Sequence, residues 1–207
     1  MTIKKETMKA LLSLFALAIA GIAFKLADPL PIGADIPMAA TKMKDVSGKI
    51  ISLNDVKTSN GLLVMFSCNT CPYVVKNQSR TTDIGNFATG KNIGFVVLNS
   101  NEGNRANEDS YKAMQQYAAS QHYKWPYVVD SNNELADAFG ASRTPECYLF
   151  DGRGKLVYRG AIDDSPADPS KVSRNHLKEA ITEMASGKSV SVKESRSVGC
   201  GIKRKEG

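Results

Sequence analysis

The chain has 207 residues, of which 42% are hydrophobic and 23% are charged, and its net charge is +6. This length supports one well-buried core but not two, so we expect one domain. The positive charge is spread along the chain, apart from Lys203-Arg204-Lys205 near its end. Nucleic-acid binding needs a denser basic patch interleaved with aromatic residues, so we expect no nucleic-acid partner and interpret this cluster as part of a solvated tail.

The first 23 residues have the pattern of a signal peptide. Lys4, Lys5 and Lys9 form a positive segment, and residues 10–23 form an apolar stretch that ends in small residues. This stretch is shorter than the roughly 20 residues that a membrane-spanning helix needs. We therefore expect a periplasmic or secreted protein, with membrane contact only if the leader is not cleaved.

The segments after the leader predict a linker, a hairpin and a buried strand. Residues 24–35 contain Pro and Gly and are expected to form a linker into the domain. A β-hairpin is predicted over residues 41–46 and 50–53, around a glycine turn. The apolar run at residues 61–66 has the composition of a buried strand.

Two cysteines follow that strand directly, in the motif Cys68-Asn69-Thr70-Cys71-Pro72. This spacing is typical of a redox-active dithiol. Pro72 suits the first turn of a helix, whose positive end favours a thiolate on Cys68. We therefore predict that Cys68, reachable at the end of the strand, is the nucleophile. Cys71, one turn into the helix, then attacks the mixed disulfide, releases the product and leaves a Cys68–Cys71 disulfide.

A structural disulfide or half of a metal site would also explain two nearby cysteines. A disulfide between such close neighbours closes only a small loop and contributes little stability. A zinc site needs further ligands, but Cys147 and Cys200 stand alone and the only histidines are His122 and His176. We therefore favour the redox interpretation, with no metal and no cofactor beyond the Cys68–Cys71 disulfide.

The remaining segments alternate between strands and helices. Strands or extended segments are predicted at residues 93–99, 125–130, 147–150 and 156–159, and helices at 72–78, 110–120, 133–139 and 173–186. Alternation that ends in a hairpin and a helix is typical of an α/β sandwich.

Thr144-Pro145 precedes the predicted strand at 147–150. Proline cannot donate to a sheet, so it is expected at a turn or in a cis peptide bond. In the α/β arrangement above, a cis bond would hold the backbone of Thr144 against the dithiol. An incoming peptide or thiol would then find a polar edge to pair with.

Six segments recur in this order in one family, and they are listed here: 68–74 (CNTCPYV), 97–101 (VLNSN), 125–127 (WPY), 141–146 (ASRTPE), 156–164 (LVYRGAIDD) and 199–203 (GCGIK). They resemble the peroxiredoxin-like branch of the thioredoxin superfamily, the redoxin-domain or AhpC/TSA-type proteins, over about residues 32–203. The resemblance implies a thioredoxin-like fold with a central mixed sheet, flanking helices and an N-terminal β-hairpin extension. The implied domain occupies residues 36–190, followed by a tail at 191–207.

The same resemblance implies that Cys68 and Cys71 are the redox pair and Pro145 the cis-proline, with Thr144 beside them. Two positions depart from the family pattern. Thr70 stands where histidine is frequent, which removes a positive charge near the thiolate, and Arg204 stands where tryptophan is usual.

The leading hypothesis is an exported thiol–disulfide oxidoreductase. Its expected partners are a disulfide-containing protein or small thiol substrate, and a thiol reductase that donates electrons, because an oxidising compartment would otherwise keep the pair oxidised.

One alternative is a thiol peroxidase with Cys68 as the peroxidatic cysteine. Peroxiredoxins carry a hydroxyl residue and a proline ahead of that cysteine, where this chain has Met65 and Gly61. A less favoured alternative is a non-catalytic copper or haem-maturation partner.

Four further residues have more modest interpretations. Cys147, in a predicted strand, is expected to be a small buried hydrophobe. Cys200 is left open as a spare thiol, a resolving cysteine that folds back on the site, or a partner of Cys147. Asp163 and Asp164 are expected to cap a loop or face solvent.

Overall fold

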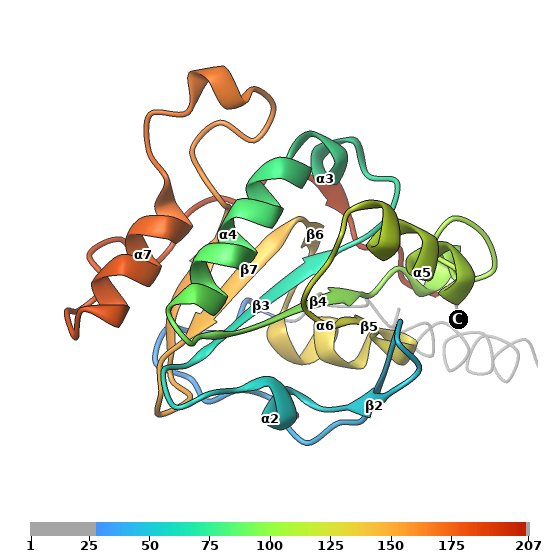
Figure 1. The fold of residues 1–207 in the computed structure, drawn as a ribbon, viewed down its shortest axis with the longest axis horizontal. Coiled ribbons are helices and arrows are strands. Elements are labelled where there is room, and N and C mark those ends of the chain that lie inside the picture. The colour runs from blue at the N-terminus through green and yellow to red at the C-terminus, as the bar shows by residue number, and fades with distance from the viewer. Residues whose placement is uncertain (1–27, 206–207) are drawn as a thin grey trace, which may run out of the picture.

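The computed structural model describes residues 28–205. The predicted signal peptide and the first residues of the predicted linker lie outside this range. Within it, seven strands form one mixed sheet in the order β2-β1-β5-β4-β3-β7-β8 (Figure 1). At its centre, β3 (Leu62–Ser67) pairs in parallel with β4 (Gly94–Asn99) and antiparallel with β7 (Glu146–Phe150). Every residue of these three strands is buried, as expected for strands covered on both faces.

The outer strands extend this centre on both sides. On one side lie β5 (Tyr127–Val129) and the hairpin of β1 (Met43–Asp45) and β2 (Ile50–Ile51). On the other side, β8 (Leu156–Gly160) forms an antiparallel hairpin with β7. The predicted α/β class, mixed sheet and N-terminal hairpin are confirmed.

Helices cover both faces of the sheet. The helices α4 (Gln78–Gly90), α5 (Tyr111–Ser120) and α7 (His176–Ala185) pack on one face, and α4 and α7 lie in front of the sheet in Figure 1. The short helices α2 (Leu53–Val56) and α6 (Glu134–Phe139) pack on the other. Alternate residues of β3 point into the two resulting cores, because side chains along a strand face opposite sides.

Two predicted elements differ in detail from the structure. The strand predicted at 50–53 ends early, since Ser52 and Asp55 form a capping box that begins α2 at Leu53. The motif helix divides into α3 (Pro72–Lys76) and α4 at Asn77. The buried side chain of Asn77 donates to the carbonyls of Tyr73 and Pro166, and its backbone leaves the helical region, with φ −96° and ψ 3°.

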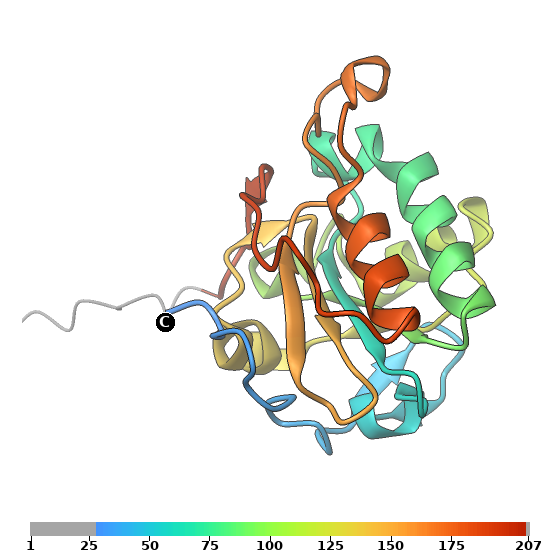
Figure 2. The same ribbon diagram turned by 90° about the vertical axis from the view of Figure 1, so that its left-hand side faces the viewer.

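The two end segments of the described chain pack against the domain. Leu30 N–H donates to the Phe139 carbonyl, so the described part of the predicted linker is bound to the domain surface. At the other end, β9 (Cys200–Gly201) pairs antiparallel with β6 (Arg143–Thr144). Figure 2 shows this last segment, in dark red, beside the sheet. The tail is therefore not a free segment, because backbone pairing and the ion pair of Arg204 with Asp137 fix residues 199–204 to the domain. Lys203 and Lys205 of the basic cluster are exposed, as expected.

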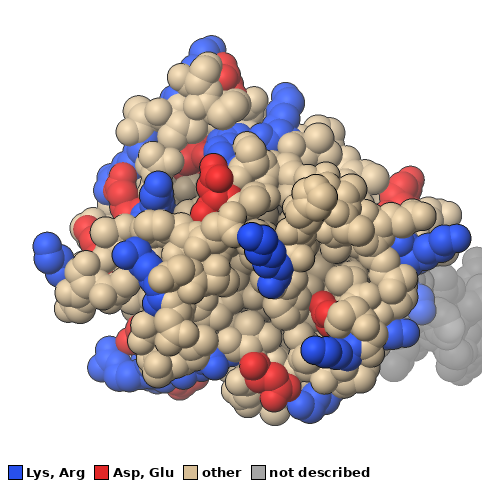
Figure 3. Space-filling view, in the orientation of Figure 1, with Lys and Arg blue, Asp and Glu red and all other residues tan. Residues whose placement is uncertain are grey.

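Charged residues of both signs are intermixed on the face shown in Figure 3. Within residues 28–205, none of the helices has the length and apolar character that crossing a membrane requires.

Candidate redox site

The two motif cysteines lie where β3 gives way to α3. Cys68 directly follows the last residue of β3, and Cys71 is the N-cap of α3, with Pro72 at its first position as expected. Both are free thiols, and their exposed fractions are only 1% for Cys68 and 4% for Cys71. The expectation that Cys68 can be reached at the strand end is wrong in this conformation, because Cys68 is buried and Thr144 packs against its sulfur.

Thr144 and Pro145 pack against the dithiol. Their peptide bond is cis, which confirms the predicted backbone geometry. Thr144 Oγ1 lies 3.4 Å from Cys68 Sγ, and the Thr144 carbonyl oxygen lies 3.3 Å from Cys71 Sγ. The antiparallel pairing of β7 with β3 produces this arrangement, since Glu146 stands opposite Phe66 at the end of β3.

Glu146 shapes the loop that presents Thr144. Its carboxylate accepts hydrogen bonds from the backbone N–H groups of Ser142 and Arg143, at 2.9 and 3.2 Å. Burial raises the pKa of Glu146, while these hydrogen bonds oppose the rise. The residue after the cis-proline therefore fixes the path of the chain before it.

A third cysteine completes the cluster. In the β6–β9 pair, Cys200 stands opposite Thr144, and its Sγ lies 2.6 Å from Cys71 Sγ. Cys200 is half-buried. The three cysteines line a cavity of about 200 Å³, together with side chains that include Asn101, Asn104 and Lys203. Of the alternatives left open for Cys200, the structure shows the one in which it folds back on the site, beside the motif cysteines.

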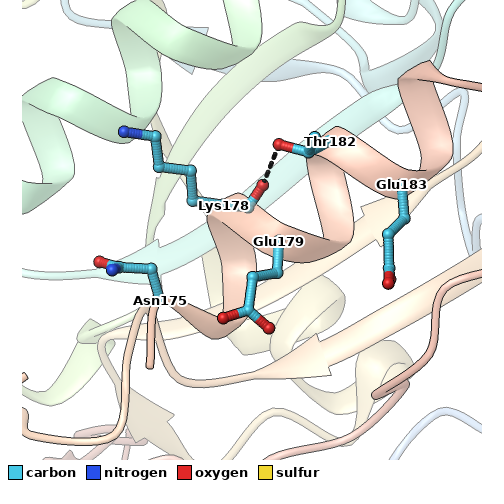
Figure 4. Close-up of a pocket in the computed structure, with 5 residues that line it drawn as sticks. All are labelled: Asn175, Lys178, Glu179, Thr182 and Glu183. Carbon is cyan, nitrogen blue, oxygen red and sulfur yellow. Dashed lines mark hydrogen bonds between the residues drawn. The ribbon is translucent and has the colours of Figure 1, made fainter. Parts of the chain in front are cut away.

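A larger hollow of about 450 Å³ lies along α7 and contains no sulfur. It is lined by Asn175, Lys178, Glu179, Thr182 and Glu183 (Figure 4). Thr182 donates to the Lys178 carbonyl within the helix, and Lys178 extends towards α4, where its ammonium lies over the Phe87 ring. These side chains are engaged with their own surroundings, so we place the chemistry at the cysteines.

Residues 31–175 match the profile of the Redoxin family. This chain belongs to the Redoxin family. No curated protein matches the sequence of this redoxin.

Two solved structures are similar to this redoxin over most of both chains. An uncharacterised conserved protein from Geobacillus kaustophilus is 34% identical with a TM-score of 0.81, and the match covers 87% of this chain and 96% of that one. A hypothetical protein from Sinorhizobium meliloti is 29% identical with a TM-score of 0.79, covering 87% and 98%. The thioredoxin domain of a thiol–disulfide oxidoreductase from Bacteroides vulgatus is 20% identical with a TM-score of 0.53, covering 67% and 93%. This last likeness shows the thioredoxin-like fold alone.

The pKa values of the three site thiols are shifted in different directions. A hydrogen bond from Cys68 lowers the pKa of Cys71 to about 4. The same hydrogen bond, together with burial, raises the pKa of Cys68. Burial, followed by the hydrogen bond with Cys71, raises the pKa of Cys200. The shift at Cys68 is therefore opposite to the one expected for the predicted thiolate on this residue, and Cys71 is the thiol whose pKa is lowered.

A buried polar network supports the motif loop. Asp109, fully buried, accepts hydrogen bonds from Asn69 N–H at 2.9 Å, Asn99 Nδ2 at 2.7 Å and Asn101 Nδ2 at 2.9 Å. Asn69 also accepts from the Tyr127 hydroxyl. Sequence patterns predicted no element between residues 99 and 110 and gave no indication of this network. The dense run of Asn and Asp after a buried strand is the signal that would have indicated it.

The other candidate residues have structural surroundings. Asp163 accepts from the backbone N–H of Ser165 and Asp164 from that of Ser173, as expected of loop caps. Asp163 also forms a buried ion pair with Arg80 at 2.6 Å. Cys147 is fully buried in β7, opposite Met65, and burial raises the pKa of its thiol. His122 is exposed, in the turn after α5.

Proposed function

We propose that this redoxin is a thiol–disulfide oxidoreductase that uses the Cys68/Cys71 dithiol. The observation that carries the proposal is the packing of both sulfurs against Thr144, at 3.4 and 3.3 Å, where β3 meets α3. Exchange with a disulfide R–S–S–R′ converts the two thiols into a Cys68–Cys71 disulfide and releases RSH and R′SH. The reverse reaction oxidises a dithiol.

The surroundings of Cys71 suit a sulfur that gains and loses a proton during exchange. As a thiol, Cys71 donates to the Thr144 carbonyl oxygen at 3.3 Å. The neighbouring Cys68 thiol lowers the pKa of Cys71 and so favours its thiolate. Each protonation state of Cys71 therefore has a stabilising neighbour inside the site.

The substrate in this proposal is a disulfide of a protein or small molecule, and a thiol reductase returns electrons to the pair. We also propose export through residues 1–23, which lie outside the described residues. Mass spectrometry of the protein purified from its native compartment tests this second proposal: a chain that begins near residue 24 supports export, and a chain that retains residues 1–23 in the cytoplasm contradicts it.

A redox titration tests the proposed activity. The protein is equilibrated in glutathione buffers of graded potential, its free thiols are alkylated, and the cysteine pairs are read by peptide mass spectrometry. A reversible disulfide that includes Cys68 or Cys71, with a midpoint inside the buffer range, supports the proposal. Accumulation of sulfenic acid on Cys68 with peroxide, without exchange in glutathione, would instead support the peroxidase alternative.

A further inference from the structure

External disulfides have restricted access to the motif pair in this structure. Cys68 and Cys71 are 1% and 4% exposed, whereas Cys200 is half-buried. The tail also occupies the edge at Thr144, where an extended substrate segment would pair with the backbone. A disulfide that approaches from solvent therefore meets Cys200 before either motif cysteine.

Cys200 is already placed for exchange with Cys71. Their sulfurs lie 2.6 Å apart, and a disulfide bond is about 2.05 Å long. Little movement is needed to convert this contact into a bond. Of the two sulfurs, that of Cys71 has the lowered pKa, and a thiol with a lowered pKa is suited to attack a neighbouring disulfide.

The tail that carries Cys200 is held on both sides of that residue. After Cys200, Ile202 is buried and donates its N–H to the Ser142 carbonyl, and Lys203 N–H donates to Asn101 Oδ1 at 2.9 Å. Before it, Gly199 lies so close to Thr144 that a Cβ atom there would overlap the Thr144 carbonyl oxygen. Cys200 therefore has a defined position, and Gly199 is required for it.

We propose that Cys200 is a third redox cysteine, through which disulfides exchange with the buried Cys68/Cys71 pair. This proposal rests on the proposed thiol–disulfide activity. In the first step, Cys200 gives up its proton and attacks R–S–S–R′, forms a mixed disulfide with R and releases R′S⁻, which takes up that proton. The Cys71 thiolate then attacks Cys200 Sγ, so that the bond to R breaks, RS⁻ leaves and a Cys71–Cys200 disulfide forms.

In the last step, Cys68 attacks Cys71 Sγ. The Cys71–Cys200 bond breaks, a Cys68–Cys71 disulfide forms, and the Cys200 thiolate takes the proton that Cys68 gives up. Two protein thiols have then been oxidised and one substrate disulfide reduced to two thiols. Cys200 returns to its reduced state, and because each exchange step is reversible, a reducing thiol can return electrons to the pair through the same steps.

Rapid trapping with glutathione disulfide tests the sequence of steps. The reduced full-length protein is mixed with the probe, quenched with acid at increasing times, alkylated and analysed by peptide mass spectrometry. We expect glutathione first on Cys200, then a Cys71–Cys200 disulfide, and finally the Cys68–Cys71 disulfide. C71S should retain the glutathione adduct on Cys200, and C68S should stop at Cys71–Cys200.

Two further variants separate the thiol of Cys200 from the position of the tail. C200S should lower the rate of reaction with glutathione disulfide by roughly tenfold or more, since the accessible thiol is lost. G199A keeps all cysteines but displaces the tail, so Cys200 should still form its adduct while the Cys71–Cys200 disulfide is strongly reduced. G90A is the matched control, because a Cβ at Gly90 meets nothing within 4 Å, and it should behave as the wild type.

Two results would overturn the proposal in distinguishable ways. If C200S forms the Cys68–Cys71 disulfide at the wild-type rate, with the first glutathione on Cys68 or Cys71, the role of Cys200 is wrong and the proposed function stands. If neither Cys68 nor Cys71 enters any disulfide in any variant, both proposals fail.

Discussion

The Asp109 carboxylate accepts a hydrogen bond of 2.9 Å from the backbone N–H of Asn69, the residue that follows Cys68. A residue on the loop after β4 therefore fixes the backbone between the two motif cysteines. The same carboxylate binds Asn101, whose side-chain oxygen accepts from Lys203 N–H in the tail. One buried carboxylate thus connects the dithiol loop with the segment that carries Cys200.

Removal of this carboxylate should destabilise the protein and loosen the site. In Asp109→Ala, three buried donors lose their acceptor, and each such group costs about 1–3 kcal/mol. We expect a clear decrease in the free energy of unfolding, measured by urea denaturation, and faster alkylation of Cys71. Asp83→Asn, at an exposed position of α4, is the control and should leave both unchanged. Equal stability of the two variants would contradict the role of the network.

The hydrogen bond from Cys68 should control the ionisation of Cys71. The ultraviolet absorbance of the thiolate should persist in the wild type until the pH falls to about 4. In Cys68→Ala the donor is lost, so the midpoint should rise towards about 8.5, the ordinary value for cysteine. In Cys200→Ser the rise should be smaller, since Cys200 is a lesser cause. An identical midpoint in the wild type and Cys68→Ala would contradict this.

The lowered pKa of Cys71 should also make the stability of the protein depend on pH. The pKa of Cys71 is lower in the folded than in the unfolded chain, so its contribution is fully present above about pH 8.5 and is lost as the pH falls through about 4. The free energy of unfolding should therefore depend less steeply on pH over this window in Cys71→Ser. Urea denaturation of both proteins at several pH values measures the difference, and parallel pH profiles would be the contrary result.

The Thr144 hydroxyl should assist ionisation of Cys68. Its hydrogen bond lowers the pKa of Cys68, against the larger effects of Cys71 and burial. In a chain that carries Cys71→Ser and Cys200→Ser, Thr144→Val should therefore slow alkylation of Cys68 at fixed pH, by up to about tenfold for one hydrogen bond. Thr144→Ser keeps the hydroxyl and should restore the rate. If the two substitutions give the same rate, the contact has no such effect.

The ion pair of Arg80, in α4, with Asp163, in the loop after β8, should stabilise the folded protein. Asp163 is 1% and Arg80 12% exposed, so Arg80→Ala leaves a buried charge without its partner, at a cost of about 3–5 kcal/mol. Arg153→Ala removes a largely exposed partner of Asp151 and should cost less than about 1 kcal/mol. Thermal unfolding of both variants measures these losses of stability. Similar losses in the two variants would contradict the expectation that the buried ion pair contributes more than the exposed one.

Sequence patterns predicted the elements whose causes are local. The apolar run before Cys68, Pro72 at a helix start and the helix that ends at Phe139 each depend on neighbouring residues, and the structure has them as predicted. The cis bond before Pro145 was expected only from its place relative to the dithiol and from the family resemblance.

The features that sequence analysis missed depend on contacts between distant segments. Cys200 and Cys71 are separated by 129 positions, and the pairing of β9 with β6 helps to bring them together. The division of the motif helix at Asn77 depends on a carbonyl of Pro166, 89 positions away. Local composition has no information about such partners, so the tail was predicted as solvated and Cys68 as accessible.

Cys147 differs from the other three cysteines in that nothing but unfolding of the sheet exposes it. It lies between β3 and β8 with no exposed surface. Once the three site thiols have been blocked in the folded protein, Cys147 is the one thiol left to react. The rate at which it is labelled then reports how often the central strands separate. The chain thus contains its own native probe of global opening, independent of its redox chemistry.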